Sequence, residues 1–83
     1  MIETGNLGEL RKILTDRVGI ILKATRVDSD ISQEKLAGIL GWTRNMVANL
    51  ESGRRTLTFA DFVVVARAFN IDPERMLRRI LDW

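Results

Sequence analysis

Residues 32–53 read SQEKLAGILGWTRNMVANLESG and contain two helix starts separated by a glycine. Ser32 and Thr43 can each accept a hydrogen bond from a free amide in the first turn of a helix, so each predicts a helix start. Gly41 tolerates the left-handed conformation that ends many helices. The predicted helices span about residues 33–40 and 44–52. Two short helices joined by a three-residue turn that contains glycine form a helix-turn-helix.

Helical periodicity continues on both sides of this stretch. Apolar residues at spacings of three and four predict one long helix or two short ones over about residues 7–26. Two more helices are predicted after Thr58 and after Asp72-Pro73, where an acidic cap precedes a proline at the first helical position. We therefore predict an all-α, five-helix domain. Its expected parts are an N-terminal helical extension over residues 1–16 and a domain over residues 17–83.

The composition excludes several classes of protein. The 83 residues fit one domain, and they contain no cysteine and no histidine. The chain thus lacks thiolate nucleophiles, the commonest general base and the commonest metal ligands, so we expect no catalytic site, metal or cofactor. No apolar run approaches the roughly 18 residues of a membrane span, and the N-terminus does not resemble a signal peptide. We expect a soluble cytoplasmic protein without a membrane partner.

The net charge of +2 is small, but the positive excess is local. It falls between residues 31 and 58, where the charged residues are Lys35, Arg44, Arg54 and Arg55 against Glu34 and Glu51. A local basic patch can bind phosphate even when the whole chain is nearly neutral. Four basic residues also occur on ordinary solvated surfaces, so charge alone favours a solvated surface over a phosphate-binding one.

The outer face of the second predicted helix of this stretch carries side chains suited to reading DNA bases. Small Ala37 allows a close helix crossing, and Val47 and Leu50 are expected beneath it. The residues left outside are Arg44, Asn45, Ala48 and Asn49. An arginine fork matches guanine O6 and N7, and asparagine matches adenine N6 and N7. Such residues, placed in the first half of a helix, reach base edges when the helix enters the major groove.

The sequence resembles the Cro/phage-repressor class of helix-turn-helix proteins, which includes phage repressors, restriction-modification controllers and many antitoxins. The resemblance covers roughly residues 17–81. It rests on Arg26, residues 31–37, Leu40-Gly41, Thr43-Arg44, Val47, Leu50-Glu51, Gly53-Arg54-Arg55, Ala66, Ala68-Phe69 and Leu77. The residues of the N-terminal extension are not included in it.

The resemblance implies a role for each matching position. Arg44, Asn45 and Asn49 match base-reading positions, and Ala48 faces the groove, where a thymine methyl can meet it. The expected phosphate contacts are Gln33, Thr43, Arg54 and Arg55, although plain solvent exposure is the alternative for Gln33 and the two arginines. Arg26 and Glu51 match a pair that forms an internal ion pair. Trp42 departs from the family pattern, where a smaller aliphatic residue is usual; it either plugs the edge of the core or braces the DNA backbone.

The C-terminal residues predict a partner surface. Ile80, Leu81 and Trp83 form more apolar surface than a last helix usually exposes, whereas Leu77 is expected in the core. A self-complementary patch is the commonest route to a soluble homodimer. Such a dimer would place two recognition helices about 34 Å apart and would read a pseudo-palindromic operator.

The sequence-based interpretation is therefore a homodimeric regulator of transcription, a repressor, that binds double-stranded DNA. One alternative is an antitoxin that binds its own promoter and a toxin protein. A second is a protein-interaction module without a DNA role. An enzyme is the weakest alternative, because the sequence offers no nucleophile with a base and no metal-ligand set.

Overall fold

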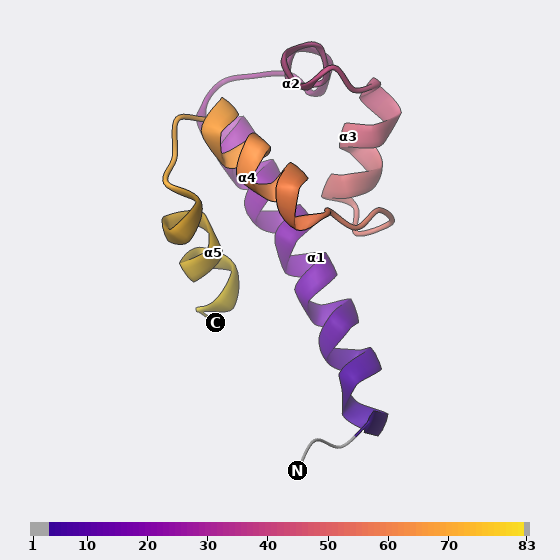
Figure 1. Cartoon of the computed structure of the whole chain (residues 1–83). Helices are drawn as coiled ribbons and strands as arrows, with labels where there is room; N and C mark the ends of the chain where they lie inside the picture. The colour runs from indigo at the N-terminus through magenta and orange to yellow at the C-terminus, as the bar shows by residue number, and fades with distance from the viewer. Residues whose placement is uncertain (1–3, 83) are drawn as a thin grey trace.

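In a computed structural model, which describes residues 4–82, five helices pack together and the first protrudes beyond the others (Figure 1). They are α1 (Thr4–Asp28), α2 (Gln33–Leu40), α3 (Arg44–Glu51), α4 (Phe59–Ala68) and α5 (Pro73–Leu81). No strand occurs in residues 4–82, so the all-α, five-helix prediction is confirmed. The N-terminal region is one continuous helix, which runs without a break past residue 16.

The four shorter helices begin at the predicted caps. The capping oxygens accept from backbone amides as follows: Ser32 from Lys35, Thr43 from Met46, Thr58 from Asp61 and Asp72 from Glu74. Gly41, with φ of 71°, ends α2, and Asn70 takes the left-handed conformation after α4 with φ of 57°. These bonds satisfy amides that a helix leaves free in its first turn, so local chemistry defines the boundaries of the helix-turn-helix.

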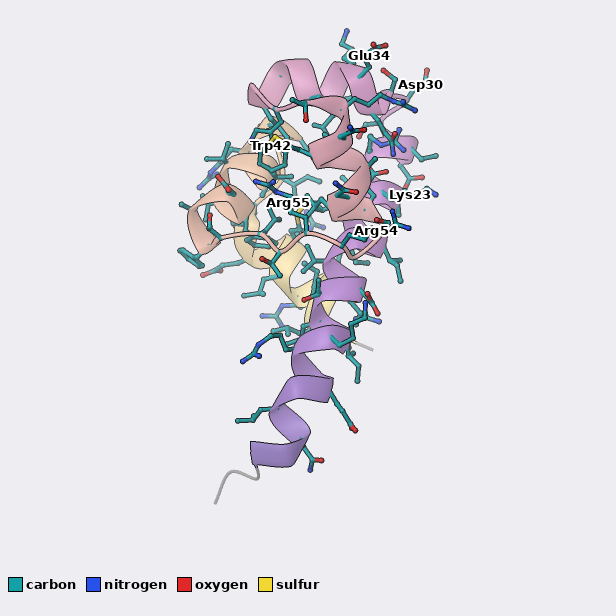
Figure 2. All side chains as sticks on the ribbon, turned by 90° about the vertical axis from the view of Figure 1, so that its right-hand side faces the viewer. Lys23, Asp30, Glu34, Trp42, Arg54 and Arg55 are labelled. Atoms are coloured by element: carbon teal, nitrogen blue, oxygen red, sulfur yellow. The ribbon has the colours of Figure 1, made fainter. Side chains whose placement is uncertain are left out.

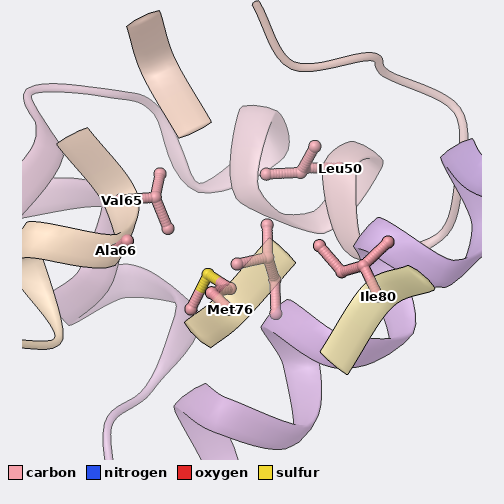
Figure 3. Packing of buried hydrophobic residues seen from close by; sticks show 6 residues of the cluster. Leu50, Val65, Ala66, Met76 and Ile80 are labelled. Atoms are coloured by element: carbon pink, nitrogen blue, oxygen red, sulfur yellow. The ribbon is translucent and has the colours of Figure 1, made fainter. Parts of the chain in front are cut away.

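The core consists of two apolar clusters that meet at α3. The main cluster joins α1, α3, α4 and α5 (Figure 3) and contains Leu22, Leu50, Val65, Ala66, Met76 and Ile80. A second cluster of Leu36, Ala37 and Val47 holds α2 against α3. Because Val47 and Leu50 belong to different clusters, α3 is anchored at two points along one side. That double anchor fixes which side of α3 faces solvent.

The backbones of α1 and α3 approach closely at Gly19. A β-carbon built on Gly19 would lie 2.6 Å from the carbonyl oxygen of Leu50 and 2.7 Å from that of Glu51. No real β-carbon approaches a backbone oxygen so closely, so only glycine fits between the two helices. Gly19 therefore sets the distance between α1 and the last turn of α3.

The rotation of α5 corrects two sequence-based predictions. Ile80, predicted at a dimer surface, is 2% exposed and packs in the core with Met76. Leu77, predicted in the core, is 43% exposed, and Leu81 is 53% exposed. Both pairs have the same spacing of four residues, so periodicity alone could not select the buried pair. Trp83, the third residue predicted at the dimer surface, lies outside the described residues.

Arg17 of α1 holds the end of α5. Its Nε donates to the carbonyl oxygen of Ile80 at 2.5 Å, and its Nη2 donates to those of Arg79 at 3.1 Å and Asp82 at 3.4 Å. The last carbonyls of a helix lack partners within the helix and bear partial negative charge. A guanidinium satisfies both needs, and it keeps the face of α5 that carries Ile80 turned toward α1.

Candidate nucleic-acid interface

The polar side of α3 faces solvent, opposite its two core anchors. Arg44, Asn45 and Asn49 are exposed, and Ala48 is half-buried between them. Side chains three and four residues apart are neighbours on a helix, and such spacings link positions 44, 45, 48 and 49, so the structure brings these four side chains together. Within residues 4–82, no hydrogen bond or ion pair is recorded for the side chains of Arg44, Asn45 and Asn49. Their donors and acceptors therefore remain available to a ligand.

A buried ion pair lies behind this face. The Nε of Arg26 lies 2.6 Å from Oε2 of Glu51, and its Nη2 donates to Oε1 at 3.1 Å. The pair is nearly dry, with 11% of the Arg26 side chain and 4% of the Glu51 side chain exposed. Arg26 also donates from Nη1 to the carbonyl oxygen of Ile31 at 2.7 Å. The expected pair is present, and it neutralises the carboxylate nearest to the polar face.

Gln33 joins this network in a way that the sequence did not suggest. Its Nε2 donates to Oε1 of Glu51 at 3.1 Å, and the residue is half-buried. The side chain thus spans from the start of α2 to the end of α3. The predicted contact of Gln33 with a phosphate, which would use the same NH₂ group as donor, remains a prediction.

The loop after α3 is tied to the helix that it follows. The amides of Arg54 and Arg55 both donate to the carbonyl oxygen of Asn49, at 2.8 and 3.2 Å, and the hydroxyl of Ser52 donates to it at 3.1 Å. The side chains of both arginines are exposed. Figure 2, which views the molecule from the side of α3, shows both arginines and Trp42 on this side. The loop therefore presents two cations beside the polar face.

Trp42 has two roles in this surface. It is half-buried and packs against both core clusters, so it fills the edge of the core, which is one of the two roles expected from the sequence. Its ring also lies under the guanidinium of Arg55, with 5.8 Å from Cζ to the ring centroid. This distance is within the range of a cation–π interaction, which restrains an otherwise mobile side chain.

Thr43 lies at the start of α3. Its Oγ accepts from the Met46 amide at 3.2 Å, while the hydroxyl hydrogen stays free to donate. Thr43 is exposed, so a phosphate at the start of α3 could accept from it. The geometry is compatible with the predicted contact at this position.

Sequence reasoning missed three residues around this interface. Gly19 and Arg17 position α3 and α5 through backbone contacts, and no motif indicates such contacts. Lys23 of α1 is exposed, and Figure 2 shows it at the edge of the side that carries Arg54. A charge count along the chain could not find Lys23, because its own segment is balanced by acidic residues.

The described residues contain neither a candidate metal site nor a candidate membrane span. No group of three or more acidic, histidine or cysteine side chains in residues 4–82 could hold a metal ion. None of the helices in this part of the chain is long and apolar enough to cross a membrane.

Comparisons with known proteins agree with this geometry. The helix-turn-helix family model matches residues 22–76, well over half of the chain. The control protein C.SmaI of Serratia marcescens is 28% identical over 71 residues, which are 86% of this chain and 80% of that protein. The crystal structure of the restriction-modification controller protein C.AhdI from Aeromonas hydrophila has 29% identity and a TM-score of 0.69. That match covers 75% of this chain and 94% of C.AhdI.

A third relative shares the fold at lower identity. The controller protein C.Esp1396I, solved as a tetramer with its natural 35 base-pair operator, has 22% identity and a TM-score of 0.69. The match covers 83% of this chain and 96% of that one. All three relatives are regulatory proteins rather than enzymes. With the α2–turn–α3 geometry, the matches show that the chain is a DNA-binding transcription regulator of the Cro/phage-repressor class of the helix-turn-helix family.

Proposed function

We propose that the chain represses transcription by binding a pseudo-palindromic operator as a homodimer. The observation that carries this proposal is the free polar face of α3, whose Arg44, Asn45 and Asn49 are exposed while Val47 and Leu50 are buried behind them. A helix anchored on one side and polar on the other can enter the major groove without exposing its core.

Each side chain on this face has a distinct task in the proposal. Arg44 donates two hydrogen bonds to O6 and N7 of a guanine, and Asn45 and Asn49 each pair with N6 and N7 of an adenine. Ala48 meets a thymine methyl. The amide side chains both donate and accept, so they discriminate adenine from guanine at the same position.

The surrounding groups grip the DNA backbone in this proposal. Thr43 donates its hydroxyl hydrogen to a phosphate, and Arg54 and Arg55 form ion pairs with phosphates beside the groove. Gln33 reaches a phosphate after its Nε2 turns away from Glu51, where the ion pair with Arg26 keeps the carboxylate neutralised. Backbone contacts of this kind position a protein on the duplex, and the bases then select the sequence.

The proposed dimer uses the exposed side of α5. Leu77 and Leu81 replace Ile80 in this surface, because Ile80 is buried. Two recognition helices about 34 Å apart read two half-sites on one face of the duplex. C.Esp1396I, solved as a tetramer on a 35 base-pair operator, supports binding by more than one copy. The relatives give no support to a toxin partner.

The test is selection of bound sequences from a random duplex pool, followed by titration of the recovered duplex. We expect two related half-sites in inverted orientation. Arg44→Ala should weaken binding by about 1–3 kcal/mol and relax the choice at one base pair of each half-site. Arg75→Ala, which removes an exposed arginine from α5, is the matched control and should leave the selected sequence unchanged. An unchanged operator preference in Arg44→Ala would refute the base-reading role. Repression itself is measured with a reporter gene placed behind the recovered operator.

A further inference from the structure

An apolar groove of about 640 Å³ opens between the N-terminal part of α1 and the helices α4 and α5. Its apolar walls include Leu7, Leu10, Leu14, Phe59, Leu77 and Leu81. Phe59 is 82% exposed, and the leucines at positions 7, 10, 77 and 81 are between 41% and 53% exposed. The largest apolar patch on a typical soluble monomer covers about 300–600 Å² and is often an interaction site, so we expect a protein partner here.

One wall of the groove is a helical arm, which we define as residues 4–14 of α1. The arm protrudes from the other helices (Figure 1), and every side chain from Asn6 to Ile13 is exposed. At 1.5 Å per residue the arm is about 16 Å long. Most helical stability in proteins comes from tertiary packing of an apolar face, which the exposed side chains of the arm largely lack within their own chain. The arm therefore gains most from a partner that covers its apolar side.

The charges around the groove favour a second copy of this chain as that partner. Two cations, Arg11 of the arm and Arg55, line the groove, whereas the adjoining hollow of α5 has a net negative charge, with Glu74 and Asp82 against Arg78. Within residues 4–82 the only ion pairs are Lys12 with Asp16 and Arg26 with Glu51, so none of these five charged side chains has an ionic partner in its own chain. Laying the arm of one copy over α5 of another brings opposite charges together and covers apolar surface on both.

The exposed area also matches what a dimer needs. The phenylalanine and four leucines together expose roughly 500 Å² of apolar surface, given about 200 Å² for a large side chain. A standard interface buries about 800 Å² per partner, of which roughly two-thirds is apolar in homodimers. A two-fold contact that includes both the arm and α5 reaches this size, whereas α5 by itself exposes only two large apolar side chains, Leu77 and Leu81.

We propose that the arm of each protomer lies across Phe59 and α5 of the other, so that the two copies cover each other's groove. This inference rests on the proposed function, since it names the surface of the homodimer. It adds to the C-terminal contact a set of residues from the opposite end of the chain. In Figure 1, α3 lies on the far side of the molecule from α5, so both recognition faces stay open to DNA.

The first test measures association by sedimentation equilibrium. Leu10→Lys places a charge in the apolar contact and should raise the dimer dissociation constant at least 100-fold. Ile20→Lys is the matched control, since Ile20 is a 62% exposed residue of the same helix that does not line the groove. Circular dichroism should show that both variants remain folded. If Leu10→Lys associates as tightly as the parent chain, or if the parent is monomeric, the inference is wrong.

The second test uses disulfide trapping, because the chain has no cysteine of its own. Leu10→Cys protein is mixed with Phe59→Cys or Leu81→Cys protein and mildly oxidised. We expect mixed disulfide dimers that form much faster than those between Ile20→Cys and the same partners. Equal rates of mixed disulfide formation for Leu10→Cys and Ile20→Cys would overturn the arm-over-α5 contact, and this comparison does not depend on how stable the Leu10→Lys variant is.

Sequence selection separates this inference from the proposed function. If selection recovers paired half-sites but Leu10→Cys is not trapped faster than Ile20→Cys, only the arm contact is refuted. If the parent chain selects no sequence from the random duplex pool, the proposed function is refuted, even if the arms cross-link. With both ideas correct, Leu10→Lys should select the same half-site as the parent chain but lose the fixed half-site spacing.

Discussion

Glu51→Gln should destabilise the chain by about 3 kcal/mol, because it leaves the charge of Arg26 without a counter-ion in a nearly dry site. The two side chains are only 11% and 4% exposed, so water can replace little of the lost interaction. Breaking one partner of a buried pair costs about 3–5 kcal/mol, and the retained amide oxygen places this variant at the lower end. A domain of 83 residues has about 4–12 kcal/mol of total stability, so the loss is large.

The measurement is urea unfolding followed by circular dichroism, at a fixed protein concentration because dimerisation contributes to stability. The matched control is Asp16→Asn, which breaks the exposed pair between Lys12 and Asp16 on α1, where 66% and 44% of the side chains are exposed. It should lose no more than about 0.5 kcal/mol. The double variant Arg26→Met with Glu51→Leu should recover most of the loss, since no unpaired charge remains. Equal losses in Glu51→Gln and Asp16→Asn would refute the reasoning.

Three further predictions follow from backbone and loop contacts. Gly19→Ala should destabilise by about 1–3 kcal/mol in thermal unfolding, because the added carbon meets two carbonyl oxygens of α3, whereas Gly8→Ala, with open space around it, should stabilise by up to about 1 kcal/mol. The opposite order would contradict the close crossing. Arg54→Ala should make the negative slope of log affinity against log salt shallower by about one without changing the selected sequence. An unchanged slope would exclude a phosphate contact. Trp42→Leu and Arg55→Ala should weaken DNA binding less than additively in anisotropy titrations, since both remove one stacked contact; full additivity would show that the stack has no role.

Most element boundaries could be predicted from the sequence because short-range chemistry defines them. Ser32, Thr43 and Thr58 start their helices through bonds to amides three residues later. Such bonds depend only on neighbours in the chain, and so does the left-handed turn at Gly41. The expected ion pair was identified by resemblance rather than by spacing, since its partners are 25 residues apart.

The remaining features depend on contacts between distant segments. The pairs Ile80 with Met76 and Leu77 with Leu81 have the same periodicity, and the choice between them depends on how α5 sits against α1. Gly19 looks like any glycine within a helix until the path of α3 is known. The inward turn of Gln33 toward Glu51 likewise requires the position of α3. Local patterns therefore predicted which residues lie on the exposed polar side of α3, whereas the contacts that hold α3 in place could be found only from the tertiary structure.

One carbonyl oxygen, that of Asn49, receives the amides of Arg54 and Arg55 and the hydroxyl of Ser52. The main chain at position 49, rather than its side chain, therefore holds in place the loop that is proposed to contact the DNA backbone. The loop therefore does not depend on the side chain at position 49. If Asn49 reads a base as proposed, another residue there changes the preferred base pair while the loop keeps its geometry. Under the proposed function, operator specificity in this scaffold can diverge through single substitutions at position 49 while the loop contacts with DNA stay as they are.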